Sequence, residues 1–498
     1  MRSCFSLRSF ASVLLLCCSL VAGAQPVVTK SSEGTDFWLT FPPNYGYQVG
    51  EIEAEDQLSF VVAARTAATV EIVATPPKAT ALSTFRQTYS LSAGEQRIIK
   101  LPKEFAIASN ATSDDKWVID EDSIRITSTT PVAVYGRNRV KFTTDGYLGL
   151  PISSLGTDYV AAAYVPSLFS TQIKVLATED STTVTLKLTE NTTDADGLAV
   201  PAKTTKQLLL QRGQTLYVAA TPDANSVKGG DLTGSTIYAD KPIAVFSGNR
   251  CTFVPIDRVA CDHLVEMLPP VNMLGSSFLL VPTVPNDAIG WQPGRARIIA
   301  AADNTTVYRN GYSVSTLGRG EWFEFKVESP ENVQTSRPAL AMQYLAAQAR
   351  IGDYGSRGDP SMMTVVPTAQ FLSSYLVSTY ENPPVPPDTI NSVRIQENFL
   401  QVVIPTGAIP SISLDGASVN PSLFFPVPRT AFSYATIPVS LGTHRIEASL
   451  PFGLYASGMG NWESYAYPGG MAMNSINDLT DPFPPNARLV QVGDVLQG

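Results

Sequence analysis

Four copies of one pattern run along this chain of 498 residues, and an internal repeat constrains the fold more than composition does. Each copy opens on a short polar run that ends in an aromatic residue. These openings read GTDF, GTDY, GSSF and LSSY and start at residues 34, 156, 275 and 372. The chain is therefore expected to build one type of unit four times.

A second block aligns without a gap in all four copies, at residues 61–70, 175–184, 298–307 and 403–412. Two apolar residues, a small or polar middle and a closing β-branched residue predict a strand, a tight turn and a second strand. In copies three and four, Asn310-Gly311 and Asp415-Gly416 follow, and such dipeptides favour type I′ hairpin turns. A third block, at 93–99, 212–218 and 319–325, follows a glycine turn and has no clear counterpart in copy four.

A closing block ends each copy with a polar stretch, a proline and an apolar run. Its prolines are Pro131, Pro242, Pro338 and Pro451. Proline cannot donate a ladder hydrogen bond, so we expect each one at the first residue of a buried strand. No helical periodicity extends beyond a turn or two.

The predicted fold class is all-β, with four pseudo-repeat β-sandwich-like units packed side by side. The predicted units are residues 34–155, 156–274, 275–371 and 372–470, followed by a C-terminal extension at 471–498. A propeller-like arrangement is the alternative; blades of about 40–50 residues would be shorter than these units. The proline-rich stretch 381–388 is expected to be a stiff insertion within the fourth unit.

The N-terminus carries the pattern of an export signal. Arg2 and Arg8 precede an apolar run at 13–21, and Ala22-Gly23-Ala24 supplies small residues before a cleavage site. Residues 1–24 are therefore predicted to be a signal peptide, which implies a secreted or extracellular-surface protein. No later apolar run is long enough to predict a transmembrane segment. The formal net charge of −9 disfavours nucleic acid as a partner.

The stretch 242–270 holds the two cysteines expected to remain after export, Cys251 and Cys261. An even pair in an oxidising compartment predicts a disulfide. His263 could join them in a zinc site, but three or four ligands would be needed and the ligand inventory is short. Asp262 and His263 could form part of a catalytic triad, but no G-x-S-x-G elbow supplies a nucleophile. We therefore predict no metal, no cofactor and no catalytic residues.

Other candidate features have simpler explanations. The densest acidic cluster lacks the ligand spacing and glycine bend of a calcium loop, so a solvated loop is favoured. It consists of Asp114, Asp115, Asp120, Glu121 and Asp122. The integrin-type tripeptide Arg357-Gly358-Asp359 lies in a glycine-rich stretch that is typical of a turn. Three N-glycosylation sequons, which count only in a eukaryotic source, begin at Asn110, Asn191 and Asn304.

Three segments resemble a known family. GTDFWLTFPPN (34–44), GNRCTFVPIDRVACDHLVEMLPPV (248–271) and GDPSMMTVVPTAQF (358–371) are similar to the N-terminal domain of the IgGFc-binding protein family. The resemblance covers about 34–470 and includes Cys251 and Cys261 at the motif's cysteine positions. It implies a secreted, β-rich module for binding or adhesion, and it carries over no catalytic residues.

The sequence thus predicts a secreted, non-enzymatic binding or adhesion protein that presents loops to an extracellular protein or glycan. Two alternatives stay open. One is a carbohydrate-active hydrolase that uses two carboxylates on facing loops. The other is a structural component of a matrix or surface layer.

Overall fold

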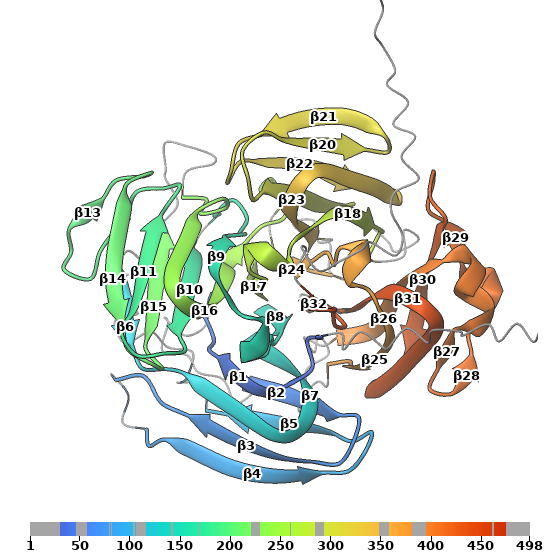
Figure 1. Cartoon of the computed structure of the whole chain (residues 1–498), viewed down its shortest axis with the longest axis horizontal. Coiled ribbons are helices and arrows are strands. Elements are labelled where there is room, and N and C mark those ends of the chain that lie inside the picture. The colour runs from blue at the N-terminus through green and yellow to red at the C-terminus, as the bar shows by residue number, and fades with distance from the viewer. Residues whose placement is uncertain are drawn as a thin grey trace, which may run out of the picture.

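The computed structural model describes residues 30–45, 57–78, 80, 82–102, 105, 116–140, 143–167, 169–220, 230–258, 260–283, 293–347, 358–380, 395–460 and 463–474. Four curled antiparallel sheets follow one another along the chain, coloured blue, green, yellow and orange-red in Figure 1. The helices within these ranges are short 3₁₀ turns. The predicted all-β fold of four repeated units is therefore confirmed. The predicted signal peptide and the proline-rich stretch 381–388 lie outside the described residues.

The first sheet has the order β4-β3-β7-β2-β5, with β1 and β8 also paired to the long strand β7. Its strands are β1 (Gly34–Leu39), β2 (Gln57–Ala64), β3 (Ala68–Ala74), β4 (Phe85–Leu91), β5 (Gln96–Leu101), β7 (Ile124–Val140) and β8 (Thr143–Leu148).

The second sheet has the order β14-β11-β16-β10-β15-β6, with β9 and β17 also paired to β16. Its strands are β6 (Val118–Asp120), β9 (Gly156–Val160), β10 (Thr171–Ala177), β11 (Thr182–Lys187), β14 (Thr205–Leu210), β15 (Thr215–Ala220), β16 (Thr236–Thr252) and β17 (Asp262–Met267). A separate hairpin pairs β12 (Thr192–Thr193) with β13 (Ala199–Val200). β6 falls within the first predicted unit yet pairs with β15, so the chain crosses between sheets before the second unit begins. The unit boundaries stay a prediction.

The third and fourth sheets repeat this order around the long strands β23 and β31. The third contains β18 (Gly275–Leu280), β19 (Gly294–Ala300), β20 (Thr305–Arg309), β21 (Tyr312–Leu317), β22 (Trp322–Val327), β23 (Glu331–Leu345) and β24 (Ser361–Thr364). The fourth contains β25 (Leu372–Ser378), β26 (Ile395–Pro405), β27 (Ser413–Leu414), β28 (Ala417–Ser418), β29 (Phe425–Pro426), β30 (Phe432–Val439), β31 (Thr443–Gly460) and β32 (Glu463–Pro468). The 3₁₀ turns are η3 (Ile152–Ser154), η4 (Val271–Met273), η5 (Thr368–Gln370), η6 (Thr406–Ser411) and η7 (Pro421–Leu423).

The closing-block prolines lie inside the long strands rather than at their first residues, so that expectation is wrong in detail. β7 pairs with β3 up to Ser128 and with β2 from Val132, and Pro131 falls in the gap. Pro242 occupies the same gap in β16, between its pairing with β11 and with β10. A missing donor costs nothing where the strand has no neighbour. Each long strand therefore joins the two halves of its curled sheet.

The second block forms strand, turn and strand in copies one to three, but the two strands are not partners of each other. The long strand lies between them in each sheet. In copy four the turn is replaced by η6. The predicted hairpin turns are present: Asn310 and Gly311 have φ of 51° and 87°, and Asp415 and Gly416 have φ of 52° and 81°. Both turns connect paired strands, β20 with β21 and β27 with β28.

One short strand from each sheet lies at the centre of the molecule. β8, β17, β24 and β32 each contact the central strands of the sheets before and after, and β8 and β32 close the circle (Figure 1). Outer strands alternate between buried and more exposed residues, as β3 does, whereas these four are buried at every position. A strand covered on both faces and at its edge has no solvated side. The arrangement around a centre has the character of the propeller-like alternative, although each unit is a complete curled sheet.

The two ends of the described chain close the circle. The backbone N–H of Ser32 donates to the carbonyl of Met471, and that of Met473 donates to the carbonyl of Lys30. Arg65, next to the first sheet, donates to Ser374 of the fourth. Tyr135 Oη donates to the carbonyls of Leu376 and Gly469. The beginning of the predicted C-terminal extension, 471–474, thus contacts the N-terminal segment. Within the described ranges, no helix has the length and apolarity that a bilayer crossing requires.

Three of the four opening signatures begin with glycine because the end of the unit packs on that residue. A Cβ on Gly34 would lie 2.3 Å from the Cβ of Pro151, and Gly156 and Gly275 meet Pro270 and Pro367 in the same way. Contacts this short leave no room for a side chain. The glycine therefore fixes how closely each 3₁₀ turn packs against its own unit's first strand.

Candidate functional site

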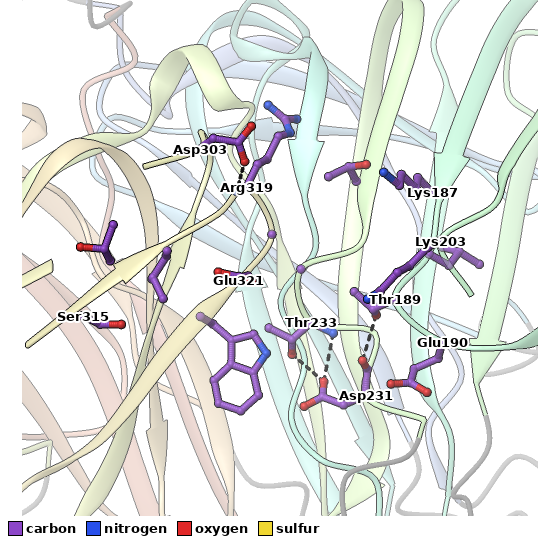
Figure 2. Close-up of a pocket in the computed structure, with 17 residues that line it drawn as sticks. Lys187, Thr189, Glu190, Lys203, Asp231, Thr233, Asp303, Ser315, Arg319 and Glu321 are labelled. Atoms are coloured by element: carbon purple, nitrogen blue, oxygen red, sulfur yellow. Dashed lines mark hydrogen bonds between the residues drawn. The ribbon is translucent and has the colours of Figure 1, made fainter. Parts of the chain in front are cut away.

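A cleft of about 960 Å³ opens between the second and third sheets. Its second-sheet side is formed by the end of β11 and the residues that follow, together with Lys203 and the segment before β16. Its third-sheet side is formed by the second half of β21, by the turn that leads into β22 and by Asp303, in the turn between β19 and β20. Figure 2 shows this cleft with its lining side chains. Its volume is in the range typical of small-ligand sites in proteins.

The two sheets touch at the cleft through two glycine turns. Gly234 and Gly320 have φ of 86° and 81°, in the left-handed region that glycine tolerates best. A Cβ on Gly234 would lie 1.8 Å from the carbonyl oxygen of Gly320, and one on Gly320 would lie 2.4 Å from that of Gly234. Both residues line the cleft. Direct backbone contact between the sheets therefore sets the width of the cleft at this point.

A buried arginine fastens the junction. Arg297, on β19, is fully buried; its Nη1 lies 2.9 Å from Asp231 Oδ2 and its Nε 2.8 Å from Glu324 Oε2. Its guanidinium lies 3.9 Å from the ring centroid of Trp322 and 4.5 Å from that of Tyr164. Burial disfavours the charged form, but Asp231, Tyr344 and Glu324 outweigh it and raise the pKa of Arg297. Arg297 thereby holds Asp231 and Trp322, which both line the cleft.

The same junction is built once earlier in the chain. Lys174, the residue before the second block of copy two, is buried and pairs with Asp122 of the first copy. Arg297 stands at the equivalent place in copy three and pairs with Asp231 of the second copy. Each pair joins one sheet to the sheet before it. The ion pair is therefore a repeated structural device.

The acidic side chains on the third-sheet wall serve the local turns. Asp303 Oδ1 accepts the backbone N–H of Arg319 at 2.8 Å, and Glu321 Oε2 accepts that of Gly318 at 2.7 Å. Equivalent bonds recur in copy two, where Asp180 accepts from Arg212 N and Gln214 from Gln211 N. One oxygen of each wall carboxylate is thus committed to backbone. The other oxygen remains available as a hydrogen-bond acceptor.

The second-sheet wall carries two lysines, Lys187 and Lys203, together with the acids Glu190 and Asp231. Lys187 and Lys203 are exposed, and neither ammonium group has a hydrogen-bond or ion-pair partner among the described residues. In Figure 2 they lie across the cleft from Asp303 and Glu321. Arg319, by contrast, donates to the carbonyl of Ala301 at 2.9 Å and pairs with Asp158. On the lysine side, Asp231 is paired with Arg297 and Glu190 also has an interaction partner. The unpaired cations of the cleft therefore face a wall of hydrogen-bond acceptors.

Hydroxyl groups complete the lining. Thr189 Oγ1 donates to the carbonyl of Asp231 at 3.0 Å, and Thr233 Oγ1 donates to Asp231 Oδ1 at 2.6 Å. Ser315 and Thr316 of β21 add two more. Such a surface can bind a polar ligand by hydrogen bonds. Within the described ranges, no group of three or more His, Cys, Asp or Glu side chains is arranged to hold a metal ion.

The two predicted disulfide cysteines are bonded to each other in the structure. Cys251 is the second-last residue of β16 and Cys261 directly precedes β17, with Cα atoms 5.2 Å apart. They close a loop that leads from the long strand of the second sheet to its central strand. The disulfide lies away from the cleft lining.

Asp262 and His263 lie at the centre of the molecule, on β17. Asp262 Oδ1 accepts the backbone N–H groups of Thr144 and His263, at 2.6 and 2.7 Å. Burial, reinforced by Asp359, Asp145 and Glu463, raises the pKa of Asp262 well above its usual value. Burial also lowers the pKa of His263 to about 4, so its imidazole is neutral at neutral pH.

Asp145 of β8 is the carboxylate that links the central strands. It accepts the backbone N–H groups of Val265 on β17 at 3.1 Å and of Met362 on β24 at 3.2 Å, and that of Gly146 on its own strand. Burial raises its pKa, while these N–H groups act in the opposite direction. The central strands do not pair with one another, so their buried edge N–H groups need side-chain acceptors. These acids therefore have structural roles.

Two acids of the predicted acidic cluster also act at a sheet junction. Asp122 pairs with Lys174, and burial raises its pKa. Asp120 Oδ1 accepts the backbone N–H groups of Lys78 and Glu121. Asp114 and Asp115 lie outside the described residues.

The remaining predicted features are dispersed. Arg357 lies outside the described residues, while Asp359 is buried near the centre, where burial raises its pKa. Asn110 also lies outside them. Asn191 is exposed and accepts the N–H of Ala202, and Asn304 is exposed in a turn with φ of 56°. None of these residues lines the cleft.

Sequence reasoning did not identify the cleft residues, although two signals were present. A basic residue precedes the second block in copies two and three, at Lys174 and Arg297. In the third block, Trp322 stands where Thr215 and Gln96 stand in the other copies. The first signal is a shared feature of two copies, and the second is a departure from the repeat at Trp322. No sequence signal pointed to Lys187 or Lys203.

Comparisons with known proteins agree on one family. A family model described as IgGFc binding protein matches residues 145–458. The human IgGFc-binding protein is 27% identical over 369 residues, which is 70% of this chain and 6% of that protein. The chain therefore spans a small part of the length of this relative. The matched range includes both walls of the cleft and the cysteine pair.

Proposed function

The chain belongs to the IgGFc-binding protein family, and we propose that it is a secreted, non-enzymatic binding or adhesion protein. Its partner is an extracellular protein or glycan, bound in the cleft between the second and third sheets. The observation that carries this proposal is which charged side chains of the cleft already have partners and which do not. The acids Asp231, Asp303 and Glu321 are held by structural contacts, and Glu190 also has an interaction partner. Lys187 and Lys203 are left for a ligand.

The contacts made by the acids of the cleft argue against the hydrolase alternative. Hydrolysis of a glycosidic bond needs two carboxyl groups that act on the substrate from opposite sides. Asp303 and Glu321 lie on one wall of the cleft, and each supports a turn. Across the cleft, Asp231 is engaged by Arg297 and Thr233, and Glu190 also has an interaction partner. Turnover of a polysaccharide panel that disappears in Glu321→Gln would favour the hydrolase instead.

Binding is tested with the exported chain on a glycan array and against immobilised IgG Fc fragments, since the relative's name refers to Fc. A variant that fills the cleft, Thr316→Trp, should abolish whatever binding is found. Ser313→Trp is the matched control, because it adds the same side chain to an exposed position of β21 outside the cleft lining. No binding in either assay, or equal loss in both variants, contradicts the proposal. Self-assembly without partner binding would favour the structural-component alternative.

Export is tested separately. Expression of the full chain should give an extracytoplasmic product whose first residue is Gln25, as the predicted cleavage after Ala24 requires. Retention of residues 1–24 in the mature protein contradicts a secreted location. The disulfide is consistent with an oxidising compartment.

A further inference from the structure

We propose that the cleft binds a terminal acidic sugar, a ring that carries one carboxylate among several hydroxyl groups, as sialic and uronic acids do. This inference rests on the proposed binding function and names the chemistry of its ligand. It follows from the distribution of charge across the cleft.

The two unpaired lysines of the second-sheet wall attract an anion, since the acids beside them, Glu190 and Asp231, have partners of their own. Lys187, at the end of β11, and Lys203, before β14, are exposed and have no partner among the described residues. Lys206, close by in sequence, is instead paired with Asp194 at 3.1 Å. Two unpaired ammonium groups on one wall of a concave site attract a carboxylate, and a charge-assisted hydrogen bond is stronger than a neutral one.

The opposite wall requires hydrogen-bond donors that carry no negative charge. In Asp303 and in Glu321, one carboxylate oxygen accepts a backbone N–H and the other oxygen remains available as an acceptor. Sugar hydroxyls can donate to these oxygens. A polyanion such as a heavily sulfated chain would place negative groups against this wall and be repelled. The cleft therefore selects a ligand with charge at one end and hydroxyls at the other.

A rigid aromatic residue adds apolar surface. Trp322 lines the cleft, and Arg297 lies 3.9 Å from its ring centroid, which fixes the indole. The C–H faces of a sugar ring are apolar and pack against such surfaces, while the hydroxyls on its edge meet polar groups. Thr189, Ser315 and Thr316 supply those groups. A site that is already ordered loses little entropy on binding.

The test measures the affinity of the full exported chain for 3′-sialyllactose, 6′-sialyllactose and lactose by calorimetry. At least one sialylated sugar should bind about tenfold or more tightly than lactose, because a hydrogen bond to a charged group is the stronger kind. Lys187→Ala combined with Lys203→Ala should remove that preference and leave the melting temperature unchanged. Lys100→Ala combined with Lys326→Ala is the matched control, since both lysines are exposed on strands elsewhere. The control should bind as the wild type does.

Three results would overturn the inference. Sialylated sugars could bind no more tightly than lactose. Their binding could be unaffected by loss of Lys187 and Lys203. A glutamate-rich peptide could bind in a lysine-dependent way while the sugars do not, which would identify an acidic protein segment as the ligand. If Fc or neutral glycans bind independently of the lysines, only this inference is contradicted. If no probe binds, the proposed function is contradicted as well.

Discussion

Replacing Arg297 by methionine should destabilise the junction between the second and third sheets more than any exposed arginine substitution. Methionine fills similar space but removes the positive charge. Asp231, only 6% exposed, then keeps a buried carboxylate without its cation. Breaking a buried ion pair in this way costs about 3–5 kcal/mol. The stacking on Trp322 contributes about 0.5–2 kcal/mol more, because the site is desolvated.

Arg125 provides the matched control. It also pairs with an aspartate, Asp36, and its guanidinium lies 5.5 Å from the ring centroid of Trp38. The side chains of Arg125 and Asp36 are 46% and 26% exposed, however, so water can replace much of what is lost. The expected cost of Arg125→Met is about 0–1 kcal/mol.

The assay combines urea unfolding with hydrogen exchange followed by mass spectrometry. A chain of four sheets need not unfold in one step, so exchange in peptides from β16 and β22 reports the junction directly. Faster exchange there in Arg297→Met, with little change in the fourth sheet, is the expected result. Equal stability of the two variants, or a uniform increase in exchange, would refute the reasoning.

Three further predictions concern other parts of the fold. Replacing Cys251 and Cys261 by serine should lower the free energy of unfolding by about 2–3 kcal/mol in the chain-entropy model. It should also speed hydrogen exchange in the loop before β17. Free thiols in the exported protein would contradict a structural disulfide. Gly234→Ala should weaken the junction between the second and third sheets and distort the cleft, because its Cβ would lie 1.8 Å from the carbonyl oxygen of Gly320. Unchanged ligand affinity and melting temperature would contradict this expectation. His263, with a folded pKa of about 4 against about 6.5 unfolded, contributes stability that is complete above the unfolded pKa. That contribution falls by about 3 kcal/mol as the pH drops from the unfolded pKa through the folded pKa. The difference in unfolding free energy between wild type and His263→Gln should therefore shrink over this pH range. A constant difference would show that His263 does not titrate there.

Much of the fold could be predicted because the repeat carries local information. Strand patterns, glycine turns and the dipeptides Asn310-Gly311 and Asp415-Gly416 depend on neighbouring residues, and all of these form strands or turns. The closing-block prolines were predicted at the first residues of strands, and only the reason given, that no ladder donor is needed there, agrees with the structure. Their location inside long strands was missed, because a strand that changes partners midway looks like two strands in sequence.

The candidate site could not be predicted in the same way. Its unpaired lysines come from the second copy and the acceptors opposite them from the third, and a sequence does not state which faces of two units meet. Asp262 and His263 illustrate the reverse error. They are adjacent polar residues that suggest chemistry in sequence, yet they are buried at the centre as partners of backbone groups.

The sequence by itself determined that this protein consists of four similar β units, because periodicity and turn chemistry are local properties of the chain. The tertiary structure decided how the units meet: central strands whose buried N–H groups need Asp145, and two sheets in contact through Gly234 and Gly320. It also decided that Lys187 and Lys203 lie opposite Asp303 and Glu321. Packing brings together residues that are far apart along the chain, and the charge pattern of a cleft exists only after that packing is complete.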